Sequence, residues 1–424
     1  MPLLNKIPRP EPDPARRTFR RRARSLPATA DAPPLPSAPR TPAWSPLRLA
    51  LTAFFATDGF LFAGWVVRVP AVKAQVHASP GALGLALLCI SAGAVGTMAV
   101  VGRLCVRYGN HPVTVGTGLM LSVGVALPAY AHSMAALSAA LLFFGAGYGA
   151  LNVAMNSAAV DVVTALRRPV MPTFHAAYSL GGLCGAGIGG LLAARLTTAW
   201  HLGLTAALGA VVTVVAGVVL LRAPAAVRPH PQAESPTAAR PHSRQITVLV
   251  VLLGLTALCS SYGEGALGDW AALHLTDDLH TTTGLAAAGY GAFAFAMTAG
   301  RLGGTWMSMR LGQTRVMAGG GMLACGGMLM AALAPAVPVV LAGFVLVGLG
   351  LANMFPLAIA RAGILAGPQG VATASTLGYA GMLIGPPVIG FLADGLGLPT
   401  ALTTVAALAA VSGAIAVGTD RRRG

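Results

Sequence analysis

The stretch ITVLVVLLGLTALCSSYGEGALGDW (residues 246–270) decides the fold. It begins as an unbroken apolar run, and a helix of about 20 apolar residues is long enough to cross the hydrocarbon core of a bilayer. Two acidic residues, Glu264 and Asp269, then follow where such a helix approaches its far end. The stretch therefore predicts a membrane-spanning helix that carries ionisable groups in or near the membrane.

The composition extends this interpretation to the whole chain. Of its 424 residues, 55% are hydrophobic and only 9% are charged, and the mean hydropathy is +0.72. Soluble proteins carry about 25% charged residues, so a soluble multidomain protein is excluded. Comparable apolar stretches recur twelve times. We therefore predict an all-α polytopic membrane protein with 12 transmembrane helices.

The charge distribution predicts the orientation. A formal net charge of +16 would suggest a nucleic-acid partner in a soluble protein, but here the basic residues gather in the tails and between the apolar runs. Only Arg68, Lys73 and Arg195 fall on the side opposite the termini. By the positive-inside rule, both termini are expected to lie on the cytoplasmic side of the plasma membrane. Membrane lipid, not nucleic acid, is the partner that these charges indicate.

The order of apolar, basic and proline-rich segments divides the chain into parts. We expect, in chain order, a disordered basic Pro-rich cytoplasmic tail at 1–44, an N-terminal six-helix bundle at 45–221, a cytoplasmic linker at 222–245, a C-terminal six-helix bundle at 246–418 and a basic tail at 419–424.

The two predicted bundles share a faint internal repeat. RYGNHPV (107–113) aligns with RLGQTRV (310–316), and YSLGGLCGAGIGGL (178–191) aligns with YAGMLIGPPVIGFL (379–392). Two parallel six-helix halves are typical of secondary transporters that rock around a site at the membrane midplane. We therefore predict two pseudo-symmetric bundles.

At this point the sequence resembles a known family, the major facilitator superfamily. GRLCVRYGNHPV (102–113) is similar to the family's loop signature, although Val106 stands where that signature has Asp. NVAMNSAAVDV (152–162), FHAAYSLGGLCGAG (174–187), EGALGDW (264–270) and GYAGMLIGPPVIGFLADGLGL (378–398) resemble the fucose-permease-like branch, closest to the bacterial YbjJ-like inner-membrane transporters. The resemblance implies the twelve-helix fold and transport by alternating access, but it names no substrate.

Two carboxyl groups lie deep in the predicted helices. Asp58 is about 16 Å into the first helix at 1.5 Å per residue, and Glu264 is about 27 Å into the seventh. Ionisable groups at such depth cost several kcal/mol unless they are paired or wetted, and so they often mark transport pathways. Asp58 and Glu264 are the proton-coupling candidates. The alternative for Asp58 is a carboxylate neutralised by a fixed hydrogen bond or an arginine.

Other polar residues are candidates for lining a substrate cavity. Tyr148, Asn152 and Asn156 recur every four residues and form one stripe on the fourth predicted helix. His175 and Tyr178 share a face of the fifth. Asn353, with Pro356, is expected to interrupt the tenth. Polar residues on a shared face can bind a hydroxylated solute, but they can equally hold helices together.

Four charged residues are candidates for gates or charge latches. Arg107 lies in the loop signature, and Asp161 is expected to end the fourth helix near basic residues. Asp269 falls at the predicted outer interface, where we expect anchoring or gating rather than transport. Arg301 ends an apolar run and is expected to pair with a carboxylate, because its guanidinium cannot lose its charge.

No motif of the sequence predicts a cofactor or metal site. GAGIGG (185–190) matches GxGxxG, but it lies inside an apolar run and follows no strand. We expect no cofactor, no metal and no enzymatic activity. The interior residues predict a secondary active transporter that moves a small polar organic solute, with protons as the coupling ion. A proton-antiporting drug or metabolite exporter is the alternative, although a 6% content of aromatic residues argues against a broad drug pocket. An alternative of another class is a non-transporting membrane sensor or scaffold.

Overall fold

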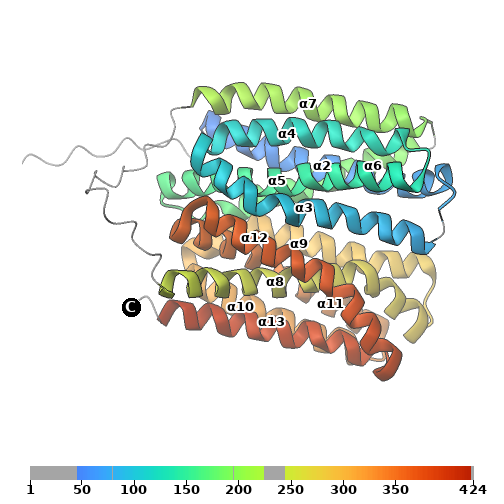
Figure 1. The fold of residues 1–424 in the computed structure, drawn as a ribbon. Helices are drawn as coiled ribbons and strands as arrows, with labels where there is room; N and C mark the ends of the chain where they lie inside the picture. The colour runs from blue at the N-terminus through green and yellow to red at the C-terminus, as the bar shows by residue number, and fades with distance from the viewer. Residues whose placement is uncertain (1–44, 79, 194, 224–243, 422–424) are drawn as a thin grey trace, which may run out of the picture. The chain divides into compact units, whose positions relative to one another are not determined.

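A computed structural model describes residues 45–78, 80–193, 195–223 and 244–421 (Figure 1). The expected tail at 1–44, most of the expected linker at 222–245 and residues 422–424 lie outside the described residues. By its internal contacts, Ala43–Gly424 forms one compact unit.

In the part of the chain that the structure describes, every regular element is a helix. The α-helices are α2 (Pro46–Gln75), α3 (Pro80–Tyr108), α4 (Asn110–Ala126), α5 (Met134–Leu166), α6 (Met171–Ala193), α7 (Thr198–Arg222), α8 (Arg244–Leu273), α9 (Thr283–Leu311), α10 (Gln313–Leu333), α11 (Val337–Leu351), α12 (Met354–Leu396) and α13 (Leu398–Arg421). A 3-10 turn, Leu127–Tyr130, extends α4, and a π-helical turn, His274–Asp278, extends α8. Side-chain caps fix several helix starts: the hydroxyl of Ser45 accepts from the Arg48 N–H at 3.2 Å, and that of Ser133 accepts from the Ala136 N–H at 3.2 Å.

The helices are long and apolar enough for a membrane. Among the described residues, nine helical segments could cross a bilayer by length and composition. One of them, Val337–Leu396, has 60 residues, which is too long for one crossing. It divides into two arms at Ala366 and Gly367, whose backbone is not helical. With α6 and α9 beside them, these segments are consistent with twelve crossings.

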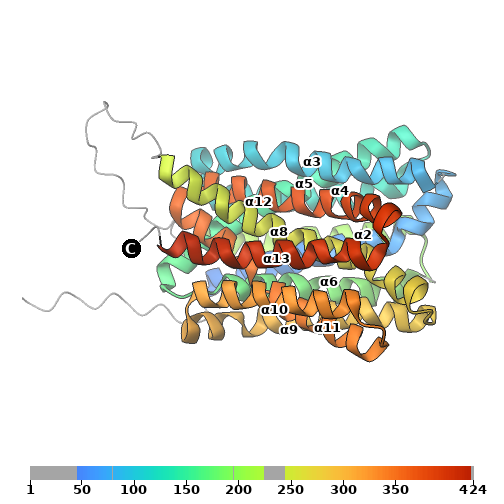
Figure 2. The same cartoon turned by 90° about the horizontal axis from the view of Figure 1, so that it is seen from below.

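The helices form two bundles, and the apolar core of the first extends into α8 and α12 of the second. Figure 1 shows α2–α7 on one side of the described unit and α8–α13 on the other, and Figures 1 and 2 show the helices running nearly along one axis. Phe54 and Phe144 are buried in the core of the first bundle, and Phe293 and Phe344 in that of the second. The expectation of an all-α protein with two six-helix bundles is confirmed.

Glycines bring the cavity-bearing helices into close contact. A Cβ atom at Gly59 of α2 would collide with the carbonyl oxygen of Tyr178 on α6, and one at Gly181 of α6 with that of Ala56 on α2. In the second bundle, Gly381 of α12 packs in the same way on Leu258 of α8. Small residues let membrane helices approach backbone to backbone, and this packing fixes the side chains between them.

The bundles are linked near one end. We call the end where α2 starts and α13 finishes the terminal side. There, the hydroxyls of Thr173 on α6 and Thr305 on α9 lie 3.0 Å apart, and Thr305 also donates to the carbonyl oxygen of Pro169 at 3.1 Å. On the neighbouring seam, Gly102 of α3 lies against Ala372 of α12. These contacts close the space between the bundles on the terminal side.

Within α12 the chain turns at Gly367, where φ is +58° and glycine carries no steric penalty. Two local expectations are settled by the helix boundaries. Asp161 does not end its helix, because α5 continues to Leu166. An interruption does lie at Asn353, between the end of α11 and the start of α12.

Candidate functional site

A cavity lies between the two bundles. Its volume is about 70 Å³, which is smaller than the roughly 300–1,000 Å³ of most small-molecule sites. Its lining comes from both bundles and consists of Phe55, Tyr148, Asn152, Met155, His175 and Tyr178 of the first and Ser261, Glu264, Arg301, Phe355, Tyr379 and Met382 of the second. Any solute held there would therefore contact both halves at once, as alternating access requires.

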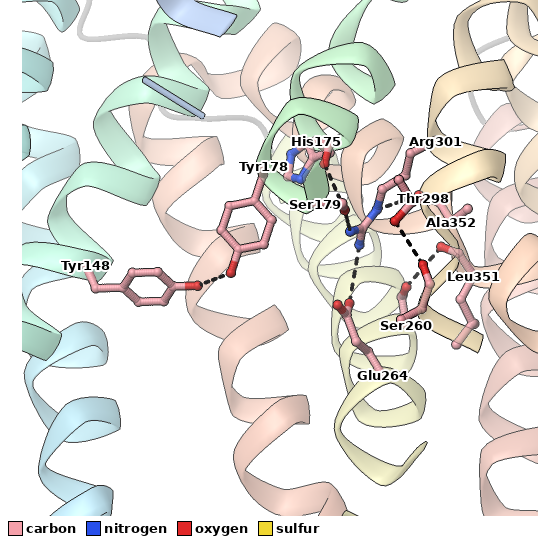
Figure 3. Close-up of polar contacts among 11 residues, drawn as sticks. Tyr148, His175, Tyr178, Ser179, Ser260, Glu264, Thr298, Arg301, Leu351 and Ala352 are labelled. Carbon is pink, nitrogen blue, oxygen red and sulfur yellow. Dashed lines mark hydrogen bonds and ion pairs between the residues drawn. The ribbon is translucent and has the colours of Figure 1, made fainter. Parts of the chain in front are cut away.

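One wall of the cavity is the polar stripe of α5. Because Tyr148, Asn152 and Asn156 are spaced by four residues, they share one face of the helix. The Tyr148 hydroxyl lies 2.7 Å from that of Tyr178 on α6 (Figure 3). Asn152 also lines the cavity, and its buried Oδ1 has no hydrogen-bond partner in the described part of the chain. The stripe thus offers a hydroxyl pair and an amide to a bound solute.

Asn156 lies behind this wall and is fully buried. Its Nδ2 donates to the Asn152 carbonyl oxygen at 2.8 Å, and its Oδ1 lies 3.2 Å from Nε2 of His175, whose ring lines the cavity. Since an amide oxygen only accepts, Nε2 is the protonated nitrogen in this arrangement. Asn156 therefore orients the His175 ring, and it does not line the cavity.

The second bundle contributes a charged cluster. Nη1 of Arg301 donates to the Ser179 hydroxyl of α6 at 2.6 Å, and Nη2 donates to Glu264 Oε2 of α8 at 3.4 Å (Figure 3). Its Nε donates to the carbonyl oxygen of Ala352, the residue before Asn353, at 3.4 Å. One guanidinium on α9 thus joins α6, α8 and the interruption between α11 and α12.

Asp58 has a contrasting environment on α2. Its side chain is 0% exposed, and neither carboxyl oxygen has a hydrogen-bond partner among the described residues. Asp58 does not line the cavity, but Phe55, one turn earlier on the same face, does. The carboxyl group is thus isolated within the protein, one helical turn from the cavity wall.

The remaining candidates lie away from the cavity. The Nδ2 of Asn353 donates to the Gly300 carbonyl oxygen at 3.0 Å, so this residue ties α9 to the helix interruption. Asp161 accepts from Nδ2 of Asn110 at 2.6 Å near the terminal side. Arg107 is exposed and stacks over the Tyr108 ring, and Asp269 is exposed near the far end of α8. Of the six residues expected to line the cavity, Tyr148, Asn152, His175 and Tyr178 do so.

Three aromatic residues of the cavity were not predicted. Besides Tyr148 and Tyr178, it is lined by Phe55, Phe355 and Tyr379, although the chain as a whole is poor in aromatics. A chain-wide percentage cannot show that a few rings converge on one place. The internal repeat held a usable signal, because its alignment pairs Tyr178 with Tyr379 and both tyrosines line the cavity.

Metal ligands do not converge in the described residues: no group of three His, Cys, Asp or Glu side chains is placed to hold an ion.

The sequence of this chain matches known proteins along most of its length. The family model of the Major Facilitator Superfamily matches residues 49–380 and 253–423. The chain belongs to the major facilitator superfamily. It is 34% identical over 364 residues to an MFS-type transporter of Yersinia pestis, a match that covers 84% of this chain and 91% of that protein. It is also 34% identical to a transporter of Sinorhizobium fredii over 347 residues, covering 81% and 90% of the two chains.

Solved structures support the fold of this transporter. The Escherichia coli fucose:proton symporter superposes with a TM-score of 0.69 at 19% identity, covering 87% of this chain and 98% of that one. The same permease in an outward conformation gives a TM-score of 0.72 at 17% identity, covering 88% and 98%. At such identities the likeness shows the fold alone. The chain is a multi-pass membrane transporter of bacterial type.

Proposed function

We propose that this transporter moves a small polar organic solute across the bacterial inner membrane by alternating access, coupled to protons. The basic residues on the terminal side support a cytoplasmic location for that side under the positive-inside rule. With the bundles linked on that side, the described state would receive solute from outside. The cavity would then open inward when the terminal-side contacts separate.

The observation that carries proton coupling is the isolated carboxyl group of Asp58. An ionised carboxylate with no hydrogen bond, fully buried at membrane depth, costs several kcal/mol. Protonation removes that charge, so the proton-loaded transporter would pass through the closed state at lower cost. The contact of Gly59 with the backbone of Tyr178 ties this part of α2 to a helix that lines the cavity. Rocking of the bundles could in this way expose Asp58 to each side in turn.

Proton flux in reconstituted vesicles tests the proposal. A pH-sensitive dye inside proteoliposomes should report proton entry when a solute is added outside, and an inward proton gradient should drive solute uptake. Asp58→Asn should abolish both signals. Asp277→Asn, which removes an exposed carboxylate beyond α8, is the matched control and should retain them. Proton exit on solute uptake would indicate export by antiport, and full coupling in Asp58→Asn would overturn the assignment to Asp58.

A further inference from the structure

The two charged residues of the cavity are unequally available to a solute. Glu264 and Arg301 both line the cavity, but the Glu264 side chain is 30% exposed and that of Arg301 only 7%. A solute that enters the cavity therefore meets the carboxylate more readily than the guanidinium. The accessible charge in this site is negative.

Arg301 is held in place independently of Glu264. Its shortest contact is the 2.6 Å bond to Ser179, on the opposite bundle, whereas its contact with Glu264 is 3.4 Å long. The Nε bond to the Ala352 carbonyl oxygen holds the guanidinium from a third side. A guanidinium has five N–H donors, so Arg301 keeps partners even when Glu264 turns to another donor.

The Glu264 carboxylate has capacity to accept more hydrogen bonds. A carboxylate offers about four lone-pair positions. The described residues place one donor on it, the distant Nη2 of Arg301. Hydrogen bonds in which the donor or the acceptor is ionised are about twice as strong as neutral ones, and a donor that is itself positively charged adds Coulomb attraction to the carboxylate. A cationic donor from the solute would therefore gain more here than a neutral hydroxyl.

Aromatic rings surround the same space. Tyr178, Tyr379 and Phe355 line the cavity, and the rings of Tyr148 and Tyr379 meet edge to face with centroids 5.9 Å apart. The electron-rich faces of such rings attract cations, with a gain of about 0.5–2 kcal/mol for each contact. Among the lining residues, Arg301 is the sole lysine or arginine, and it is mostly covered. The lining is complementary to a cation and offers an anion little.

We propose that the transported solute carries a protonated amino group, which binds Glu264 beside the rings of Tyr178, Tyr379 and Phe355. Hydroxyl groups on the rest of the solute would reach Tyr148 and Asn152 on the opposite wall. The substrate class is therefore a small aminated polar solute, and Glu264 recognises it while Asp58 carries the proton. This inference rests on the proposed function, because it names the substrate class for the same cavity.

Ligand binding by the purified full-length protein tests this class directly. The melting temperature in detergent is measured against a panel of small polar compounds in matched sets: primary amines, their N-acetylated forms and carboxylates on the same carbon skeletons. A compound that binds only the folded protein raises its melting temperature. We expect increases from amines and not from the acetylated or carboxylate forms.

Variants assign the effect to Glu264. Loss of one charge-assisted hydrogen bond in Glu264→Gln should weaken amine binding at least tenfold, about 1.4 kcal/mol. Asp277→Asn, which removes an exposed carboxylate instead, should bind as the parent does. If Glu264→Gln does not fold, Glu264→Asp keeps the charge on a shorter side chain, and it should still prefer amines to acetylated forms while binding them more weakly.

The outcomes separate the two proposals. The substrate class is wrong if no amine raises the melting temperature, if neutral or carboxylate forms raise it as much, or if Glu264→Gln binds amines as the parent does. Binding requires no gradient, so amine binding without coupled proton flux would overturn the proposed function alone. Proton-coupled flux of a neutral solute would overturn the substrate class alone.

Discussion

Asp58 and Glu264 occupy the first helices of the two bundles, α2 and α8, and their environments are opposite. Asp58 is fully buried and has no hydrogen-bond partner among the described residues, whereas Glu264 faces the cavity and contacts a guanidinium. An isolated carboxyl group favours its neutral form, and a paired, wetted carboxylate tolerates its charge. Under our two proposals, this difference would let one pseudo-symmetric fold assign two acidic residues to separate tasks, proton transfer and solute recognition.

The largest effect is expected when the isolated carboxyl group of Asp58 is removed. Asp58→Leu should stabilise the protein by about 1–2 kcal/mol, because a buried polar group without a partner is replaced by an apolar one. Its proton-driven uptake should fall by about 100-fold, since a burial cost near 3 kcal/mol would no longer respond to protonation. Thermal unfolding and vesicle uptake, measured on the same preparation, should move in opposite directions. A loss of stability would show that Asp58 has a structural partner.

A second variant would make Glu264 more like Asp58. Arg301→Met removes the guanidinium that donates to Glu264, Ser179 and Ala352. We expect the protein to lose about 2–3 kcal/mol of stability, because each hydrogen bond to a charged group contributes about 1.5–3 kcal/mol. The loss is not larger because Glu264 stays partly solvated. Chemical denaturation in mixed micelles measures this. Arg301→Lys, which keeps the charge without the planar fork, should lose less stability. Equal losses would mean that the hydrogen-bond geometry of Arg301 contributes nothing.

Asn156 extends the comparison to an uncharged group that is both buried and partnered. Asn156→Leu leaves His175 Nε2 without its acceptor and should destabilise the protein by about 1–2 kcal/mol, the opposite sign from Asp58→Leu. The melting temperature reports the change. Asn156→Asp keeps an acceptor and separates the lost hydrogen bond from the altered volume. If Asn156→Leu stabilised the protein, the presence of a hydrogen-bond partner would not decide whether replacing a buried polar residue raises or lowers stability.

The smallest effect is expected at Asp269, which shares α8 with Glu264 but is exposed. Asp269→Asn should change stability by less than about 0.5 kcal/mol, as most surface substitutions do. Amine binding should also stay unchanged, since Asp269 does not line the cavity. A clear loss of binding would extend the recognition site towards the far end of α8.

The membrane-spanning helices, the two bundles and most of the polar lining of the cavity could be predicted from the sequence. Four-residue spacing sufficed to place Tyr148 and Asn152 on one face, because helical periodicity is a local property. The spacing could not show that Asn156 lies behind that face and contacts His175, or that Ser179 binds Arg301. Each of these contacts joins two different helices.

The terminal-side closure has a consequence for how turnover responds to conditions. Its link between Thr173, Thr305 and the Pro169 carbonyl oxygen consists of uncharged hydrogen bonds, each contributing about 1 kcal/mol. Dissolved ions weaken attraction between charges and leave such bonds nearly untouched. In the proposed alternating-access cycle, the step that separates these hydroxyls should therefore proceed at a similar rate in dilute and in concentrated salt.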